Sequence, residues 1–479
     1  MTRPQMPKQA SASPTQWDTL IKQALDVWTL GTDDANSLAA LAVVRQRMSS
    51  RSLNAAVSQL IEDALLRLEE YSAQSAEILR LRFRDKKPVR VVANKLSLAE
   101  SSIYRLQREA LQALAEIVME MESAARTKLI ADFESRLESP TYFDLIGVDA
   151  HLSQLEEALT SDGSPQILVI EGIGGAGKTA LADALMRRLI RGTSAYAFAW
   201  VTARQGGGLG VGFLPQSAQE ISTDDILLNL VDQLWGDTPA KPASPGDALH
   251  ALEYRLKVTP HIVAIDNLET VADVEQLLPI LRRLAKPSKF LLTSRKSFYD
   301  ETDVYHYPLP PLSLEDAIRL VRREAEKENL TEISQLSAAE LAPIFEVVGG
   351  NPLALLLIVG QCHFRPLATV LSDFWEARGY RTEQLYAYVY WKIWENLDDL
   401  GRKALMAMQL VPPGGEDQDY IVAVTGLKDE DVMNAIAKLM ILNLVSCQRD
   451  KPVYRYSIHS LTRSFLHQQA LKWLSEPLH

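Results

Sequence analysis

Apolar residues recur at helical spacing in the first part of the chain and again in its last third. Between residues 14 and 70 the periodic positions are Trp17, Leu20, Ile21, Ala24 and Leu25, and later Leu60, Ile61, Leu65 and Leu66. A repeat of three to four residues is typical of amphipathic helices, so this region is expected to form about three helices. Helical patterning returns from Ser313 to the end of the chain, with a short hairpin expected near residues 444–458.

Short apolar runs alternate with helical segments in the middle of the chain. The candidate strands are 167-ILVIE-171, 196-YAFAWV-201, 261-HIVAID-266 and 289-KFLLTS-294. This alternation predicts a parallel sheet covered by helices. Two stretches rich in glycine and proline, residues 205–217 and 236–247, are predicted to be surface insertions.

Length and composition set the class of protein. A chain of 479 residues is too long for one core and predicts two to four domains. Its longest apolar runs, such as 353-LALLLIVG-360, are shorter than the ~20 residues needed to span a bilayer, and its first residues have no apolar segment typical of a secretory signal. The two cysteines, Cys362 and Cys447, are too few for a disulfide framework. We therefore expect a cytoplasmic protein without a membrane partner.

A glycine-rich stretch, 172-GIGGAGKT-179, fits the pattern GxxxxGK(S/T) between a predicted strand and a predicted helix. Glycines allow backbone N–H groups to surround phosphates, Lys178 neutralises phosphate charge, and the Thr179 hydroxyl can bind Mg²⁺. The sequence therefore predicts a site for ATP or ADP with Mg²⁺. The candidate nucleotide contacts in this stretch are Gly172, Gly174, Gly175, Ala176, Gly177, Lys178, Thr179 and Ala180.

Two later strands end in residues suited to the same chemistry. In 262-IVAIDNLE-269 an apolar strand ends at Asp266, where a carboxylate can assist the metal, and Glu269 can orient or deprotonate the attacking water. Glu269 is equally consistent with a solvated residue at a helix start. In 290-FLLTSR-295, Arg295 follows a strand and can place a cation near the γ-phosphate. With Lys178, these residues form the predicted catalytic set.

The ordered motifs resemble those of the NB-ARC or AP-ATPase branch of the STAND signalling NTPases, which are relatives of plant resistance proteins and apoptotic scaffold ATPases. The resemblance runs from about Asp144 to Leu466. The further segments that carry it are 198-FAWVTARQ-205, 308-PLPPLSLEDAIRL-320, 349-GGNPLALLL-357 and 454-YRYSIHSLTRSFL-466. The third is similar to the family's GxP motif and the fourth to a winged-helix segment with an MHD-like triplet.

The resemblance implies roles for two residues far from the glycine-rich stretch. Pro352 would pack on the base, and His459 would read the β-phosphate of ADP. From the residues alone, Pro352 can simply start a helix and His459 can be a histidine beside a strand. Two positions depart from the family pattern: Ser460 stands where the triplet has an acid, and Val148 replaces the arginine of the hhGRE motif.

A basic segment lies inside an acidic protein. The chain carries a net charge of −11, yet residues 71–114 hold nine Lys or Arg against four Asp or Glu. The segment resembles the helix-turn-helix of the promoter-reading domain in bacterial sigma factors, with a core expected from Ile78, Leu79, Val92, Leu96, Ile103, Leu106 and Leu111. The residues expected to contact DNA are Lys95, Ser101, Ser102, Tyr104, Arg105 and Arg108, with Arg84, Lys86 and Lys87 near phosphates. The alternative is a module of the same shape that binds a protein.

Together these patterns predict a multidomain α and α/β protein. The expected parts are an N-terminal helical region (1–70), a helix-turn-helix domain (71–118), a linker helix (119–142), a P-loop NTPase domain (143–306), a helical lid domain (307–378) and a winged-helix domain (379–479).

Three functions fit this organisation. The first is an ATP/ADP switch with slow hydrolysis that couples nucleotide exchange to self-association in the ATP state and to binding of double-stranded DNA. The second is a signalling or immune-defence scaffold whose helix-turn-helix recruits a protein. The third is a DNA-dependent motor. A separate sensor or effector protein is expected as a partner of the switch.

Overall fold

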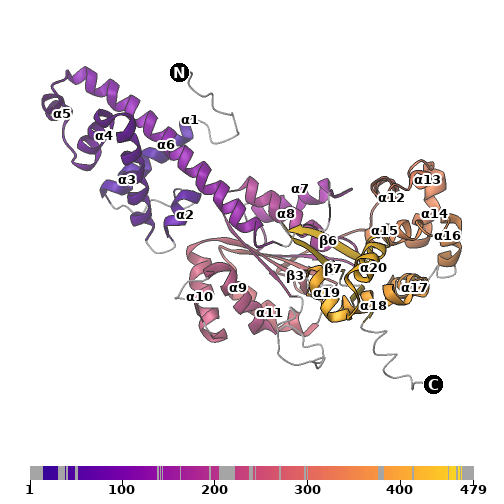
Figure 1. Ribbon diagram of the computed structural model, residues 1–479. Coiled ribbons are helices and arrows are strands. Elements are labelled where there is room, and N and C mark those ends of the chain that lie inside the picture. The colour runs from indigo at the N-terminus through magenta and orange to yellow at the C-terminus, as the bar shows by residue number, and fades with distance from the viewer. Residues whose placement is uncertain are drawn as a thin grey trace. The chain divides into compact units, whose positions relative to one another are not determined.

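The computed structural model forms two compact units, residues 1–135 with 190–196, and residues 136–189 with 197–479 (Figure 1). The residues that it describes are 14–30, 38, 41–48, 52–137, 140, 142, 144–161, 163–193, 196–203, 222–236, 241–242, 244–268, 271–295, 298, 300–375, 382–412, 415–450, 453–459, 462–463 and 465–466. The predicted loop 205–217 lies outside these ranges, as do residues 237–240 and 243 of the predicted loop 236–247, and so does Glu269.

The first unit is helical, as its apolar spacing predicts. The three expected helices are α1 (Pro14–Leu30), α2 (Ala42–Met48) and α3 (Leu53–Tyr71), and they pack with α4 (Ala73–Leu79) and the long α6 (Glu100–Glu134). Leu66 was expected on the apolar face, but its side chain is 56% exposed. The buried carboxylate of Glu122 on α6 accepts hydrogen bonds from the N–H groups of Ala42 and Val43, which ties the start of α2 to α6.

The basic segment forms a small helical core of its own. A π-helical turn, η2 (Arg80–Arg84), leads to α5 (Val89–Leu96), and Ser97 in the left-handed region (φ 54°) turns the chain into α6. Figure 1 shows α5 beside the first turns of α6. The buried residues include Ile78, Val92 and Ile103, but the expected core members Leu79 and Leu111 pack instead with the N-terminal helices. The predicted boundary at residue 118 falls inside α6, which continues to Glu134.

The second unit contains a parallel five-stranded sheet in the order β2-β3-β4-β1-β5. Its strands are β1 (Ile167–Glu171), β2 (Ala197–Thr202), β3 (His261–Leu268), β4 (Lys289–Ser294) and β5 (Val304–Pro308). Four of them match the predicted strands. The edge strand β5 was not predicted, because 304-VYHYP-308 is short and mixes polar with aromatic residues.

Helices cover both faces of this sheet, as expected for buried parallel strands. They are α7 (Asp149–Thr160), α8 (Lys178–Gly192), α9 (Thr223–Trp235), α10 (Pro245–Val258) and α11 (Val271–Leu284). Residues of α9, α10 and α11 share one core with one face of the strands. In Figure 1, α7 and α8 lie on the other side. This arrangement confirms the predicted α/β class.

The rest of the second unit is mostly helical. The chain continues through α12 (Leu314–Lys327), α13 (Thr331–Ser334), α14 (Ala338–Val348), α15 (Pro352–Gln361), α16 (Leu367–Trp375), α17 (Thr382–Glu395), α18 (Asp399–Ala407), α19 (Gln418–Thr425) and α20 (Asp429–Ile441). The antiparallel pair β6 (Val445–Asp450) and β7 (Val453–Ile458) confirms the predicted hairpin. One hydrophobic core runs from Ala317 to Leu466, so it continues across the predicted boundary between residues 378 and 379.

The turn between α14 and α15 is closely packed. A Cβ on Gly350 would lie 2.0 Å from the carbonyl oxygen of Leu312, whose N–H donates to the Gly350 carbonyl at 2.8 Å. No side chain larger than hydrogen fits at this position. Among the described helices none alone is long and apolar enough to cross a membrane, whereas α14 and α15, bent by 118°, pass that test as a pair.

Candidate nucleotide-binding site

The glycine-rich stretch forms the loop between β1 and α8. Because β1, β3 and β4 are parallel neighbours, their carboxyl ends meet at one edge of the sheet, and this loop lies there. Gly175 (φ 73°) and Gly177 (φ 93°) adopt left-handed backbone angles that other residues rarely reach. The loop leads directly into the N-terminus of α8, where backbone N–H groups and the helix dipole favour an anion.

Four polar side chains converge at this edge. The Lys178 ammonium donates to the carbonyls of Gly172 at 2.7 Å and Ile173 at 2.9 Å, which holds its charge over the loop. The Asp266 carboxylate at the end of β3 is only 2% exposed and accepts bonds from the hydroxyls of Thr179 at 2.8 Å and Thr293 at 2.6 Å. Two hydroxyl groups therefore hold the Asp266 carboxylate in place, one at the end of the phosphate loop and the other on β4.

These oxygens fit a magnesium ion. A hydroxyl and a carboxylate lie 2.8 Å apart beside the phosphate loop, and Mg²⁺ prefers one or two such ligands together with phosphate oxygens and water. Within the described residues, no group of three His, Cys, Asp or Glu side chains could hold a metal. The Thr179 hydroxyl and the Asp266 carboxylate are therefore groups that could bind Mg²⁺ together with the phosphates of a nucleotide.

The start of α15 contacts the phosphate loop directly. Asn351 is 3% exposed, and its side-chain amide donates to the Gly174 carbonyl at 3.0 Å, while the Leu353 N–H points to the Gly175 carbonyl at 3.4 Å. A Cβ on Gly175 would come within 2.9 Å of both Asn351 Oδ1 and Leu353 Cβ. Glycine at 175 is therefore required for the contact as well as for the backbone angle.

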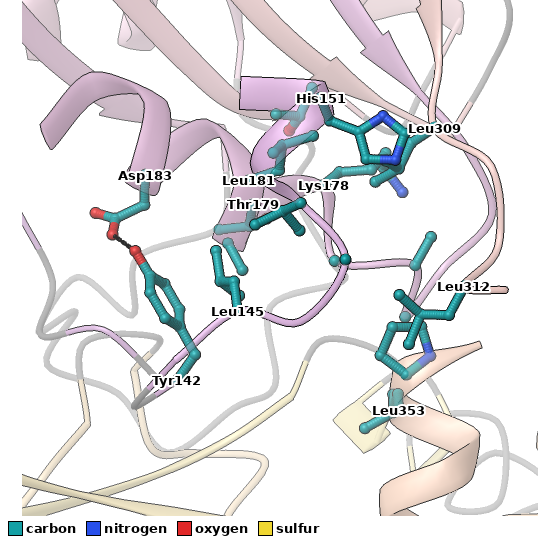
Figure 2. Close-up of a pocket in the computed structure, with 18 of the residues that line it drawn as sticks. Tyr142, Leu145, His151, Lys178, Thr179, Leu181, Asp183, Leu309, Leu312 and Leu353 are labelled. Carbon is teal, nitrogen blue, oxygen red and sulfur yellow. Dashed lines mark hydrogen bonds between the residues drawn. The ribbon is translucent and has the colours of Figure 1, made fainter. Parts of the chain in front are cut away.

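The segment before α7 forms another wall of the site. The Tyr142 hydroxyl donates to Asp183 on α8 at 2.5 Å (Figure 2), and Arg187 binds the same carboxylate at 2.8 Å. Burial and the bond to Asp183 raise the pKa of the Tyr142 hydroxyl. Two residues further along, Asp144 pairs with Arg323 of α12 at 2.7 Å. This segment is thus attached both to the phosphate-loop helix and to the first helix of the predicted lid.

These walls enclose a cavity of ≈ 510 Å³, large enough for a nucleotide. The predicted site residues that line it are Gly174, Gly175, Ala176, Gly177, Lys178, Thr179, Ala180, Asp266, Arg295, Pro352 and His459. The structure therefore brings residues more than 280 positions apart to one cavity. Gly172 does not line it, although its carbonyl accepts from Lys178.

Sequence reasoning missed Thr293, Asn351 and Tyr142. The signal for Asn351 was present, since asparagine before a proline is a common helix start, and Asn351 caps α15 by accepting from the Ala354 N–H. Thr293 is one of the polar residues that end β4. Nothing in the sequence links Tyr142 to Asp183, because their contact depends on the tertiary fold.

The predicted DNA-binding residues lie at the end of α5 and on the first turns of α6. Lys95, Ser101, Tyr104, Arg105 and Arg108 are exposed, and Ser102 is half-buried. Lys95 pairs with Glu77 at 3.0 Å and Arg105 with Glu109 at 2.9 Å. Both pairs are open to solvent, where such pairs contribute little and are readily exchanged.

Comparison with known proteins gives distant matches. No family model matches the chain. Over 339 residues, 68% of the chain, the sequence is 22% identical to disease resistance-like protein DSC1 of Arabidopsis thaliana, and it spans 26% of that protein's length.

Solved structures are also similar to the chain at low identity. A STAND protein with a tetratricopeptide repeat sensor from Pyrococcus horikoshii shows 18% identity and a TM-score of 0.44, with 69% of this chain and 44% of that chain covered. The ORC2 protein of Aeropyrum pernix shows 14% identity and a TM-score of 0.35, with 72% and 98% covered. The match to a disease resistance-like protein and the order of the motifs support the STAND or AP-ATPase class of P-loop ATPases, which the sequence motifs resemble.

Proposed function

We propose that the protein is a switch that binds ATP or ADP with Mg²⁺ and changes its assembly state with the nucleotide. The observation that carries this proposal is the direct bonding of Asn351 and Leu353 to the phosphate loop. A helix that touches the loop from outside the sheet must respond to what the loop holds. Exchange of ADP for ATP would then release or reposition the helices that follow residue 312.

His459 supports the same proposal from a third part of the chain. It follows β7 and lines the cavity together with Lys178 and Pro352. A ligand in this cavity would be contacted by the sheet, by α15 and by the hairpin region. That arrangement suits a nucleotide held as a latch, with hydrolysis slow and serving to reset the switch.

The latch is tested with Lys178→Ala. The variant should lose binding of a fluorescent ADP analogue and should keep its circular dichroism spectrum and unfolding midpoint. In size-exclusion chromatography with light scattering, the wild type should form a larger assembly with an ATP analogue than with ADP, and Lys178→Ala should not. Assembly of the variant in ATP like that of the wild type would refute the latch.

We further propose that the helix-turn-helix binds double-stranded DNA. The exposed face of α6 carries Arg105 and Arg108 beside Tyr104, within a segment of net charge +5 that contrasts with the acidic remainder. A single small head binds DNA weakly at physiological salt, and assembly in the ATP state would raise the affinity through multivalency.

The second candidate is a head that binds a protein. Tyr104 and Val91 are 59% and 48% exposed on this small domain, which also suits an apolar partner surface. Fluorescence anisotropy with duplex DNA at several salt concentrations separates the two. For DNA, Arg108→Ala should weaken binding and reduce the salt slope by about one. Substitution of Arg319 on α12, which is also exposed, by alanine should not. No binding in either nucleotide state would favour the protein partner.

A further inference from the structure

The cavity contains a second histidine, His151, for which the function proposed so far has no use. It lies on α7, three residues after Val148, and both side chains line the cavity. Residues three apart on a helix lie on one face. The side chain of Val148, which precedes the first residue of α7, has no polar atom, so His151 is the polar side chain that α7 presents to the cavity.

The ring of His151 is held in one orientation. Its Nδ1 lies 2.6 Å from the hydroxyl of Tyr307 on β5, and the two rings meet edge to face with centroids 6.0 Å apart. Tyr307 is 6% exposed, and its hydroxyl also reaches Gln154 at 3.4 Å. A buried partner therefore occupies Nδ1 and fixes the direction of Nε2.

The other polar side chains on this side of the cavity are engaged with each other. Tyr142 bonds to Asp183, Asp144 pairs with Arg323, and Asp316 accepts from Ser313 at 2.8 Å. For His151 Nε2, by contrast, no hydrogen bond to a described residue is found. Its ring lies beside Leu309 (Figure 2), among the apolar residues between β5 and α12.

We propose that His151 Nε2 forms a hydrogen bond with the nucleoside part of the bound nucleotide. The phosphates already have Lys178, Thr179 and the loop amides, whereas apolar side chains such as Leu312 and Pro352 flank the remaining space. An imidazole whose Nδ1 is engaged can offer a donor or an acceptor at Nε2, and bases and ribose hydroxyls can satisfy either. The inference rests on the proposed nucleotide site.

His151→Ala tests the contact by comparing two ligands. Titration with a fluorescent ADP analogue should show affinity reduced about fivefold to tenfold, the usual size for one hydrogen bond. Inorganic tripolyphosphate, used as a competitor, has no nucleoside and should displace the analogue with an inhibition constant that the substitution leaves unchanged. His250→Ala, on the exposed face of α10, is the matched control and should bind both ligands like the wild type.

Tyr307→Phe tests the positioning of the ring. It keeps the buried ring and removes the hydroxyl that fixes His151, so ADP affinity should fall while tripolyphosphate affinity stays constant. Equal weakening of both ligands by His151→Ala would show a general effect on the fold and overturn the inference, as would unchanged ADP affinity. If the wild type itself binds no nucleotide, it is the proposed function that fails.

Discussion

Substitution of Asn351 by alanine removes two interactions at the start of α15. The side-chain oxygen no longer caps the helix at the Ala354 N–H, and the side-chain amide no longer donates to the Gly174 carbonyl. Loss of the cap lowers the stability of α15 itself. Loss of the bond to Gly174 removes a contact between α15 and the phosphate loop.

The magnitudes follow from these two contacts. Loss of an asparagine N-cap costs about 1 kcal/mol, and loss of one buried hydrogen bond costs about 1 kcal/mol. The free energy of unfolding should therefore fall by about 2 kcal/mol. Only the bond to Gly174 connects to the ligand, so ADP should dissociate about fivefold faster, the factor that corresponds to about 1 kcal/mol.

Ser337→Ala provides the control. Ser337 caps α14 in the same way, by accepting from the Glu340 N–H, but its side chain bonds to Glu340 of its own helix, whereas Asn351 also bonds to the phosphate loop. Urea denaturation should show about half the loss of stability found for Asn351→Ala, and stopped-flow displacement of a fluorescent ADP analogue should give the wild-type rate. If Asn351→Ala and Ser337→Ala release ADP at the same rate, the contact between α15 and the loop does not control the nucleotide.

Three further predictions concern other groups. Asp266→Asn should abolish the increase in ATP affinity that Mg²⁺ gives and should leave ATP affinity in EDTA nearly unchanged, as measured by calorimetry. If Mg²⁺ still increases the ATP affinity of the variant, Asp266 is not a ligand of the metal. Burial disfavours the charged form of His306, but its bonds to Glu171 and to the Glu301 carbonyl outweigh burial and raise its pKa. The contribution of these bonds to stability is therefore complete below pH ~6.5 and is lost as the pH rises through the raised pKa. The stability advantage of the wild type over His306→Asn should accordingly shrink across that range in denaturation curves, and a constant difference would contradict it. Burial raises the pKa of the Cys362 thiol to about 12, so iodoacetamide at pH 8 should modify it far more slowly in the folded protein than in urea, as read by mass spectrometry; equal rates would show that the thiol is accessible.

Sequence patterns predicted the sheet and the phosphate loop because both depend on local chemistry. The apolar runs predicted four strands. The residue types expected after such strands predicted Lys178, Thr179 and Asp266 as site residues. The strand β5 was missed because it is a short edge strand that is held in place by its pairing with β1. An edge strand that is held by one neighbouring strand and by a helix can form without an alternating or fully apolar sequence pattern.

The parts that could not be predicted depend on distant contacts. The pairing of Tyr142 with Asp183 spans 41 residues, and the link from Asn351 to Gly174 spans 177. No period or motif in a single sequence encodes such distances. The same reason explains Leu79 and Leu111, whose apolar character was recognised but whose core was wrongly assigned, because the two cores share α4 and α6.

The packing of α15 at its far end gives it a mechanical property. A Cβ on Gly360 would lie 2.9 Å from the Ile441 carbonyl, and the Asn443 amide donates to the Leu356 carbonyl at 3.0 Å, so the end of α20 lies directly on this helix. Ten helical residues make a rod ~15 Å long that is difficult to bend. A shift of Asn351 would therefore be passed along α15 to the end of α20 and would not be taken up by bending of the helix. Helix α15 therefore connects the phosphate loop at its first turn to the end of α20 at its last turn.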